Sequence, residues 1–300
     1  MIRIEKARQL GGSMKCLLIN VFLVFPVITK DLSIETILEA LHWNQKDIEG
    51  RGKKEVEAFM KSGIWKGGYC EGNPLDPMGN STYFKVANAD GEKISQLYIC
   101  YLRCIKPYVD KLTDVLEIGP GKGAWTRCFC KHQAKSIQCV DVLSAEYNNF
   151  WNNVGKKEAI SYYSTRDFLL NCIKDNSIDY VFSFGTFCHI SPVCCYEYFR
   201  NMYKKLRVGG IGFVMYADYD KKNAYANKHN LPHEFFLKYD DLDILRYKAY
   251  PIRGGRWYHL GIERAKEMLE KIGYTVFAAD INVNERDPII YFMKASGVKC

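Results

Sequence analysis

Residues 114–126, DVLEIGPGKGAWT, decide the fold that this sequence predicts. After Asp114, the residues Val115, Leu116 and Ile118 form a short apolar run interrupted by one acid, Glu117, which is typical of a buried parallel strand. Three glycines follow within five positions, and glycine lets the backbone turn sharply and lets a ligand approach it closely. A helix predicted to open near Ala124 would aim its free N–H groups at that ligand. The stretch therefore predicts a crevice at the carboxyl end of a strand in an α/β sheet.

One interpretation of this stretch is a dinucleotide site. The spacing Gly119-x-Gly121-x-x-Ala124 fits the dinucleotide fingerprint, and Asp141 follows the loop at about the distance of its ribose-binding acid. The match predicts an NAD(P)-dependent oxidoreductase as the alternative function.

A second interpretation rests on a resemblance. The pattern Glu117-x-Gly119-Pro120-Gly121-x-Gly123 resembles motif I of the class I methyltransferases, which use S-adenosylmethionine. The resemblance implies that Glu117 faces the methionine end of the cofactor and that the glycines pass beneath it. We favour this interpretation because it accounts for the acid inside the strand as well as for the glycines.

The order of predicted elements agrees with such a fold. Apolar strands and amphipathic helices alternate after the glycine loop, which predicts right-handed crossovers and a doubly wound, mostly parallel α/β sheet. The predicted strands are 136–140, 160–163, 178–184, 211–216, 275–279 and 289–293, and the predicted helices are 94–105, 144–153, 168–173, 192–206 and 262–272. The pair Gly209-Gly210 is expected to separate a helix from a strand. The resemblance implies seven strands, of which only 289–293 runs antiparallel, after a link too short for a crossover helix.

Three regions are expected along the chain. Residues 92–300 form the predicted methyltransferase domain, with a polar and aromatic insertion at 218–257. Residues 31–91 form a helical and irregular extension in which Ser33 caps a helix and a Gly- and Asn-rich loop is either a lid or an ordered surface loop. Residues 1–30 hold an apolar segment that is too short for an ordinary membrane span. It is a peripheral segment that allows weak membrane association, a strand that docks on the domain, or a stretch that includes a start at Met14.

Composition limits the partners and the compartment. The net charge is +8 without a dense basic block, since residues 51–54 (RGKK) read as a solvated surface, and this does not favour a nucleic-acid partner. The 12 cysteines include no C-x-x-C pair, so we expect reduced, buried thiols in a cytoplasmic protein and no zinc ribbon. No metal-ligand spacing links Asp218, Asp220, His229 and His233. The sequence does not predict the oligomeric state.

The cofactor residues follow from strand ends and from the resemblance. Asp141 ends the second strand, where a carboxylate can accept both ribose hydroxyls of an adenosine. The resemblance places Val142 beside the adenine ring and Asp167 near the adenine amino group. It also adds Phe168, Phe184 and Gly185 to the predicted cofactor site.

The stretch 179–190, DYVFSFGTFCHI, carries the predicted chemistry. It resembles motif IV of class I methyltransferases, where the fourth strand ends beside the transferable methyl group. With Gly209-Gly210 and 216–218 (YAD), it also resembles small bacterial methyltransferases of sugar and surface-polysaccharide gene clusters. His189 is the predicted general base, because imidazole titrates near neutral pH, and Asp218 is the alternative. The acceptor is expected to be a small hydroxylated molecule, with O-methylation of a sugar as the favoured case. A structural role for His189 and a non-catalytic cofactor-binding protein remain as alternatives.

Overall fold

The structure is a computed structural model that describes residues 33–63, 66–70, 72–79, 86–87, 91–237 and 257–296. The predictions for residues 1–30, and for the part of the insertion at 238–256, lie outside the described residues. Within the described ranges, none of the helices combines the length and the apolar character that crossing a bilayer requires.

A seven-stranded sheet forms the centre of the molecule, in the order β5-β4-β3-β6-β7-β9-β8. β9 pairs antiparallel with both of its neighbours, and the other strands run parallel to one another. The predicted doubly wound sheet with one antiparallel strand is therefore confirmed, and that strand, β9, is inserted second from the edge. The strands are β3 (Asp114–Ile118), β4 (Ser136–Asp141), β5 (Ile160–Ser164), β6 (Ile178–Ser183), β7 (Leu206–Met215), β8 (Tyr274–Ala278) and β9 (Ile289–Lys294).

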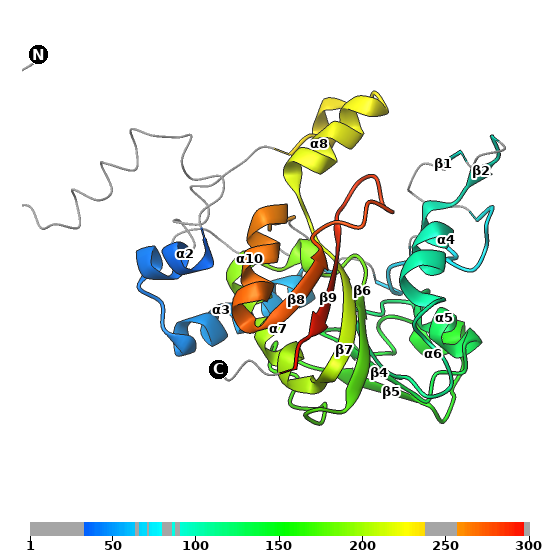
Figure 1. Ribbon diagram of the computed structural model, residues 1–300, viewed down its shortest axis with the longest axis horizontal. Coiled ribbons are helices and arrows are strands. Elements are labelled where there is room, and N and C mark those ends of the chain that lie inside the picture. The colour runs from blue at the N-terminus through cyan, green and yellow to red at the C-terminus, as the bar shows by residue number, and fades with distance from the viewer. Residues whose placement is uncertain are drawn as a thin grey trace, which may run out of the picture.

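Two helical layers cover the sheet (Figure 1). One face packs against α7 (Pro192–Lys205), α10 (Ile262–Ile272) and the N-terminal helices α2 (Ile34–Leu41) and α3 (Gln45–Lys61). The opposite face packs against α4 (Gln96–Cys100), the π-helical turn Tyr101–Ile105 that continues it, α5 (Thr126–Lys131) and α6 (Phe150–Val154). β3, which lies between β4 and β6, is buried along its whole length. Smaller elements are β1 (Val86–Ala87), β2 (Lys93–Ile94), α8 (Tyr219–Lys228) and the 3₁₀ turns Phe187–His189 and His233–Phe235.

The N-terminal helices are well defined by their caps. Ser33 accepts a hydrogen bond from the Thr36 N–H, as predicted, and Asn44 forms a capping box with Asp47 at the start of α3. The prediction that residues 51–54 are a solvated surface is wrong for Arg51, which is buried in α3 beside Glu55. The sequence pattern did not indicate this burial, because the ion-pair partner of Arg51 is Glu55, which lies outside residues 51–54.

Three predicted elements differ from the structure. Residues 168–173 are irregular rather than helical, because Leu170 has a φ of +55° and six residues are too few to stabilise a helix alone. Regular helix in the stretch 144–153 begins only at Phe150, since Asn149 has a φ of +51°. β7 begins at Leu206 and includes Gly209-Gly210, where its pairing with β6 shifts register, so these glycines bend a strand rather than precede it.

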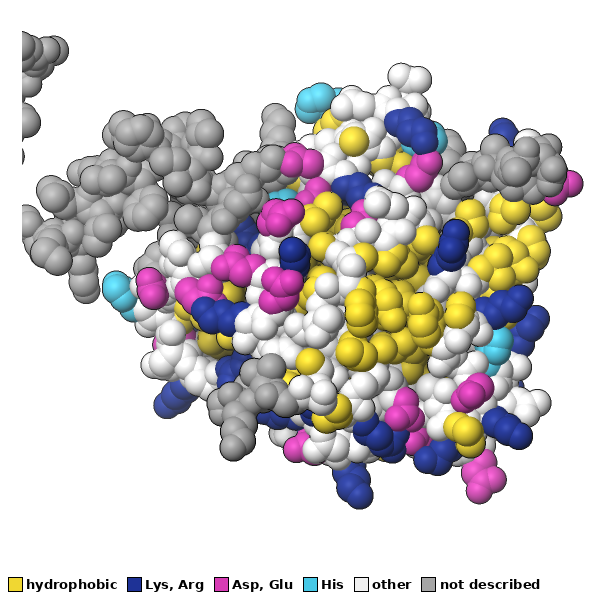
Figure 2. Space-filling model, in the orientation of Figure 1, with side chains coloured by type: hydrophobic (Ala, Val, Ile, Leu, Met, Phe, Trp, Pro, Cys, Tyr) yellow, Lys and Arg dark blue, Asp and Glu magenta, His cyan; other side chains and the backbone are white. Residues whose placement is uncertain are grey.

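The described cysteines are free thiols, and most of them are buried, as the composition predicted. An aromatic row crosses the outer strands: Phe213 stacks on Tyr291 with ring centroids 4.5 Å apart, Phe277 lies 4.8 Å from Tyr291, and Tyr108 lies 5.2 Å from Phe213. Phe277 is half exposed at one end of this row. Figure 2 shows hydrophobic side chains gathered on this side of the molecule, over the outer strands.

Candidate active site

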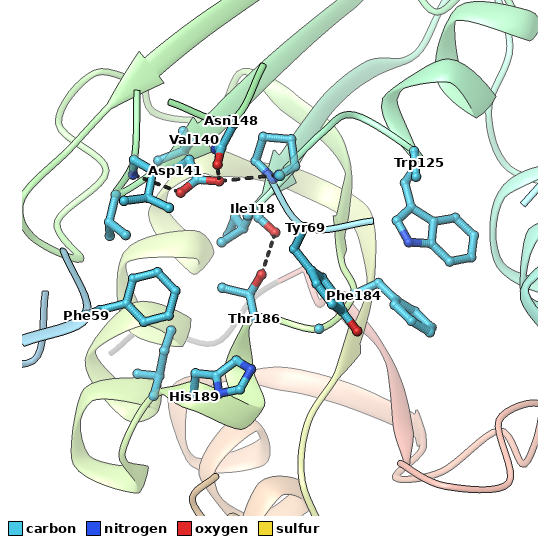
Figure 3. A pocket seen from close by; sticks show the side chains of 18 of the residues that line it. Phe59, Tyr69, Ile118, Trp125, Val140, Asp141, Asn148, Phe184, Thr186 and His189 are labelled. Carbon is cyan, nitrogen blue, oxygen red and sulfur yellow. Dashed lines mark hydrogen bonds between the residues drawn. The ribbon is translucent and has the colours of Figure 1, made fainter. Parts of the chain in front are cut away.

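A pocket with about 1070 Å³ of open space lies where β3, β4 and β6 end. Its walls include the loops after these strands, helix α3, residues 69–70 and 72–74, and Tyr198 of α7 (Figure 3). The pocket is therefore at the sheet edge that residues 114–126 predicted, and its concave wall suits a small-molecule site.

The glycine loop after β3 forms the floor of the pocket. Gly119 has a φ of +70°, and a Cβ atom there would lie 1.8 Å from Thr186 Oγ1. Gly121 has a φ of +53°, and a Cβ atom there would lie 2.7 Å from the carbonyl oxygen of Tyr69. Only glycine fits these two positions, so the loop forms a cradle that lets other groups approach its backbone closely.

The N–H groups of this loop already donate to the protein. These bonds are Gly119 N to Val140 O (2.8 Å), Gly121 N to Asp141 Oδ2 (3.4 Å), Lys122 N to Tyr69 O (3.1 Å) and Gly123 N to Pro120 O (2.7 Å). A dinucleotide site uses such N–H groups to bind a pyrophosphate, so these bonds disfavour the dinucleotide interpretation.

Asp141 ends β4 with its carboxylate in the pocket wall. Besides the Gly121 N–H, it accepts hydrogen bonds from Leu143 N (2.9 Å) and from the Asn148 side-chain amide (3.1 Å). Burial raises the pKa of Asp141 to about 6 despite these donors. The carboxylate is thus oriented by three donors and ionised at neutral pH, which suits it to accept hydroxyl hydrogen bonds.

Glu117 does not reach the pocket as the sequence suggested. Its side chain turns toward α5, where its carboxylate accepts from the Thr126 hydroxyl (2.5 Å) and from the Cys139 thiol (3.7 Å). Burial, with a smaller contribution from the charge of Asp141, raises the pKa of Glu117 to about 7. The strand alternates faces, and the odd positions of β3 point to the α5 side.

The other predicted cofactor residues divide into two groups. Val142, Phe168, Phe184 and Gly185 line the pocket together with Gly119, Pro120 and Gly121. Gly123 lies beside the pocket and packs against α6, and the Asp167 carboxylate accepts from Leu169 N (3.0 Å) outside the pocket wall.

His189 lies in the pocket wall at the end of its 3₁₀ turn. It is half-buried, with the Phe59 ring centroid at 6.4 Å and the Trp257 ring centroid at 5.7 Å. Its imidazole and the aromatic side chains around it form the end of the pocket opposite Asp141 in Figure 3.

Asp218, the alternative base, lies outside the pocket wall. Its carboxylate caps two helices, because it accepts from Lys221 N in α8 (2.8 Å) and from Ile262 N in α10 (3.3 Å). Tyr216, which belongs to the same YAD motif, donates its hydroxyl hydrogen bond to Ala279 O (2.8 Å). Both observations disfavour a direct role at the reacting atoms.

Sequence reasoning missed several pocket residues, among them Glu55, Phe59, Tyr69, Asn148 and Thr186. Of these five, only Tyr69 had a signal, as an aromatic residue in the Gly- and Asn-rich loop that was expected to be either a lid or an ordered surface loop. Among the described residues, no group of three metal-ligating side chains comes together.

Comparisons with known proteins agree with this geometry. Residues 115–210, which build most of the pocket floor, match the family model of a methyltransferase domain. No curated protein matches the chain. Residues 115–210 therefore form a methyltransferase domain within a sheet of the class I fold; the protein is an enzyme, and its cofactor is S-adenosylmethionine.

Solved structures with a similar fold are distant in sequence. An S-adenosylmethionine-dependent methyltransferase from Mesorhizobium loti is 12% identical, with a TM-score of 0.48, and the match covers 66% of this chain and 98% of that one. A putative S-adenosylmethionine-dependent methyltransferase from Listeria monocytogenes is 14% identical, with a TM-score of 0.47 and the same two coverages. One from Aquifex aeolicus is 16% identical, with a TM-score of 0.43, covering 63% of this chain and 85% of that one.

Proposed function

We propose that this enzyme methylates a hydroxyl group of a small neutral acceptor, a sugar being the favoured case, with the acceptor bound beside His189. The observation that carries the cofactor side of the proposal is the cradle of Gly119 and Gly121 beneath the oriented carboxylate of Asp141. The N–H groups of this loop already donate to the protein, so the cradle suits an uncharged or cationic ligand better than a phosphate.

The proposed cofactor contacts follow from the pocket wall. Asp141 accepts the ribose hydroxyls, and Val142 and Phe168 pack against the adenine ring. Gly119, Pro120 and Gly121 pass beneath the methionine part, with Phe184 and Gly185 beside it. Glu117 acts indirectly: through Thr126 it fixes the start of α5 next to the loop.

The cofactor supplies an electrophilic methyl group, so the protein must orient the acceptor, exclude water and remove one proton. His189 accepts the hydroxyl proton, because it is the imidazole in the wall at the end of β6. Phe59, Phe184 and Trp125 provide apolar surface that excludes water around the reacting atoms.

The charges of the described pocket wall support a neutral acceptor. Two acids, Glu55 and Asp141, line it, and the described lining includes no lysine or arginine that would bind a carboxylate or a phosphate. The resemblance of residues 179–190 to methyltransferases of sugar gene clusters is the support for a sugar. We include a cytoplasmic location in the proposal, supported by the free thiols.

Calorimetric titration tests the cofactor assignment. We expect S-adenosylhomocysteine to bind the purified protein and NADH not to bind. Asp141→Ala should weaken S-adenosylhomocysteine binding at least about tenfold, because each hydrogen bond to a charged group contributes roughly 1.5–3 kcal/mol. Asp175→Ala, at an exposed site, is the control. NADH binding without a response to S-adenosylhomocysteine would favour the oxidoreductase alternative.

A further inference from the structure

Residues 66–70 form a strap that crosses one side of the pocket. Two backbone hydrogen bonds attach it: Gly67 N donates to Tyr147 O (3.0 Å), and Tyr69 O accepts from Lys122 N (3.1 Å). Tyr69 and Cys70 line the pocket, so the strap is part of its wall. The strap comes from the N-terminal extension, whereas both of its backbone partners belong to the sheet domain.

The strap fits the domain closely at Gly68. A Cβ atom on Gly68 would lie 2.1 Å from the carbonyl oxygen of Asn148 and 2.7 Å from Lys122 Cγ. On the other side of the contact, a Cβ atom on Gly121 would lie 2.7 Å from the carbonyl oxygen of Tyr69. Two glycines, one in the strap and one in the loop, thus allow two backbones to touch without intervening side chains.

Both contacts reach the residues that form the cradle. Asn148, against which Gly68 packs, uses its side-chain amide to orient the Asp141 carboxylate. Lys122, which donates to Tyr69, belongs to the glycine loop itself. The docked strap therefore contacts both the glycine loop, at Lys122, and Asn148, which orients Asp141. A displacement of either one is transmitted to the other through the strap.

The Tyr69 side chain points into the pocket (Figure 3). A Cβ atom on Gly185 would lie 3.9 Å from Tyr69 Cε1, so the ring lies beside the loop after β6. The ring covers the space between the glycine loop and that loop, where the proposed function puts the methionine part of the cofactor.

We propose that the strap completes the cofactor site: Gly68 docks it, Tyr69 covers the bound cofactor, and the strap undocks when the cofactor enters or leaves. The proposal rests on the proposed function, because it takes S-adenosylmethionine as the ligand of the pocket. Undocking breaks the Gly67 and Tyr69 backbone bonds and leaves the sheet intact. The strap is a positioning element, and we assign it no contact with the reacting atoms.

The test compares Gly68→Ala with Gly91→Ala. Both glycines have a positive φ, +84° and +78°, so both variants carry similar backbone strain, but a Cβ atom on Gly91 meets nothing within 4 Å. We expect Gly68→Ala to weaken S-adenosylhomocysteine binding about tenfold, mainly through faster dissociation, since a docked cover slows release. Gly91→Ala should bind like the wild type. Calorimetry gives the affinity, and stopped-flow tryptophan fluorescence gives the dissociation rate.

Tyr69→Ala and Tyr69→Phe test the cover without altering the glycines. Tyr69→Ala should speed dissociation as Gly68→Ala does, and Tyr69→Phe should restore the slow rate, because the ring rather than the hydroxyl covers the ligand. Thermal melting checks that each variant is folded. Wild-type dissociation rates in folded Gly68→Ala and Tyr69→Ala would overturn the strap proposal. A wild-type protein that does not bind S-adenosylhomocysteine would instead overturn the proposed function.

Discussion

Glu117, which is buried, and Asp141, which is half-buried, are neighbouring acids with different hydrogen-bond partners. Asp141 is held by backbone and amide donors at the pocket wall, whereas Glu117 is held by the Thr126 hydroxyl behind it. The sequence motif gives no sign of this difference, because strand alternation decides which face each side chain meets. Glu117 therefore supports the glycine loop from behind, whereas Asp141 lines the pocket, where we propose that it binds the cofactor.

Glu117→Gln should change the pH dependence of stability. The pKa of Glu117 is raised from 4.5 to about 7, so the folded state binds its proton more tightly than the unfolded state does. The wild type therefore loses stability as pH rises from 4.5 to 7, and the loss persists above pH 7. Relative to the wild type, the glutamine variant should gain up to about 3 kcal/mol in free energy of unfolding between pH 4 and pH 8.

Urea unfolding of the apo protein at several pH values measures this gain. Glu158→Gln, at an exposed position, provides the control and should follow the wild-type curve at every pH. Parallel curves for Glu117→Gln and the wild type would show that the buried carboxyl does not titrate in this range.

His189→Ala should lower turnover by about 10²–10⁴-fold, the usual contribution of a positioned base, while cofactor affinity stays nearly unchanged. His189→Gln keeps a hydrogen-bonding group but does not titrate, so it should be equally slow if the imidazole takes the proton. His132→Gln is a matched control, because His132 contacts the Tyr101 hydroxyl (2.9 Å) outside the pocket wall. Methyl transfer from labelled cofactor to a panel of hydroxylated acceptors measures the rates. Full activity of both His189 variants would assign the residue a structural role.

At the scale of elements, α3 is the part of the chain that the sequence described least well. Its residues 51–54 read as a charged surface, yet Arg51 Nε donates to Glu55 Oε1 (2.6 Å) in a buried pair, and Glu55 Oε2 accepts from Ser191 N (3.1 Å) at the start of α7. This arrangement ties the N-terminal extension to the turn that carries His189.

A double-mutant cycle on Arg51 and Glu55 measures the interaction free energy between these two side chains. Arg51→Met alone should destabilise the protein by about 3–5 kcal/mol, because it leaves the Glu55 carboxylate buried without its cation. The double variant Arg51→Met with Glu55→Leu should be less unstable than the sum of the single variants by more than about 1 kcal/mol. Lys53→Met on the exposed side of α3 should stay within about 0.5 kcal/mol of the wild type. Denaturant unfolding supplies all four values, and additive effects would mean that the two side chains act independently.

Sequence patterns predicted an element correctly where the residues that determine it are adjacent in the chain. The strand before Gly119, the Ser33 cap and the Asp280–Pro288 link each depend on a few adjacent residues, and the structure agrees with them. The predicted helix at 168–173 failed because its apolar side chains are buried for tertiary reasons, with Phe168 under α3 near Gly52. Glu55, Tyr69 and Asn148 escaped prediction because they come together only through contacts between distant segments.

At the scale of the whole molecule, the N-terminal extension and the sheet domain share one pocket. Glu55, Val56 and Phe59 of α3 line it together with the strand-end loops, and α2 and α3 belong to the same buried core as α7. The sequence divided these regions near residue 91, but the described structure makes α3 part of the ligand site. The cofactor should therefore connect the extension to the domain when it binds.

Hydrogen exchange of the full chain tests this connection. A ligand that binds only the folded state stabilises it by about 2.7 kcal/mol at a hundred times its Kd. Saturating S-adenosylhomocysteine should slow amide exchange in α3 by more than it does in α8, since α3 lines the pocket and α8 does not. Local opening of α3 exposes part of the wall and becomes costlier when the ligand is bound, whereas local opening of α8 leaves the wall complete. Arg51→Met should reduce the protection of α3, because it weakens the packing of this helix on α7. Equal protection of α3 and α8, in a protein whose melting temperature rises on binding, would mean that the extension only covers the domain and takes no part in holding the cofactor.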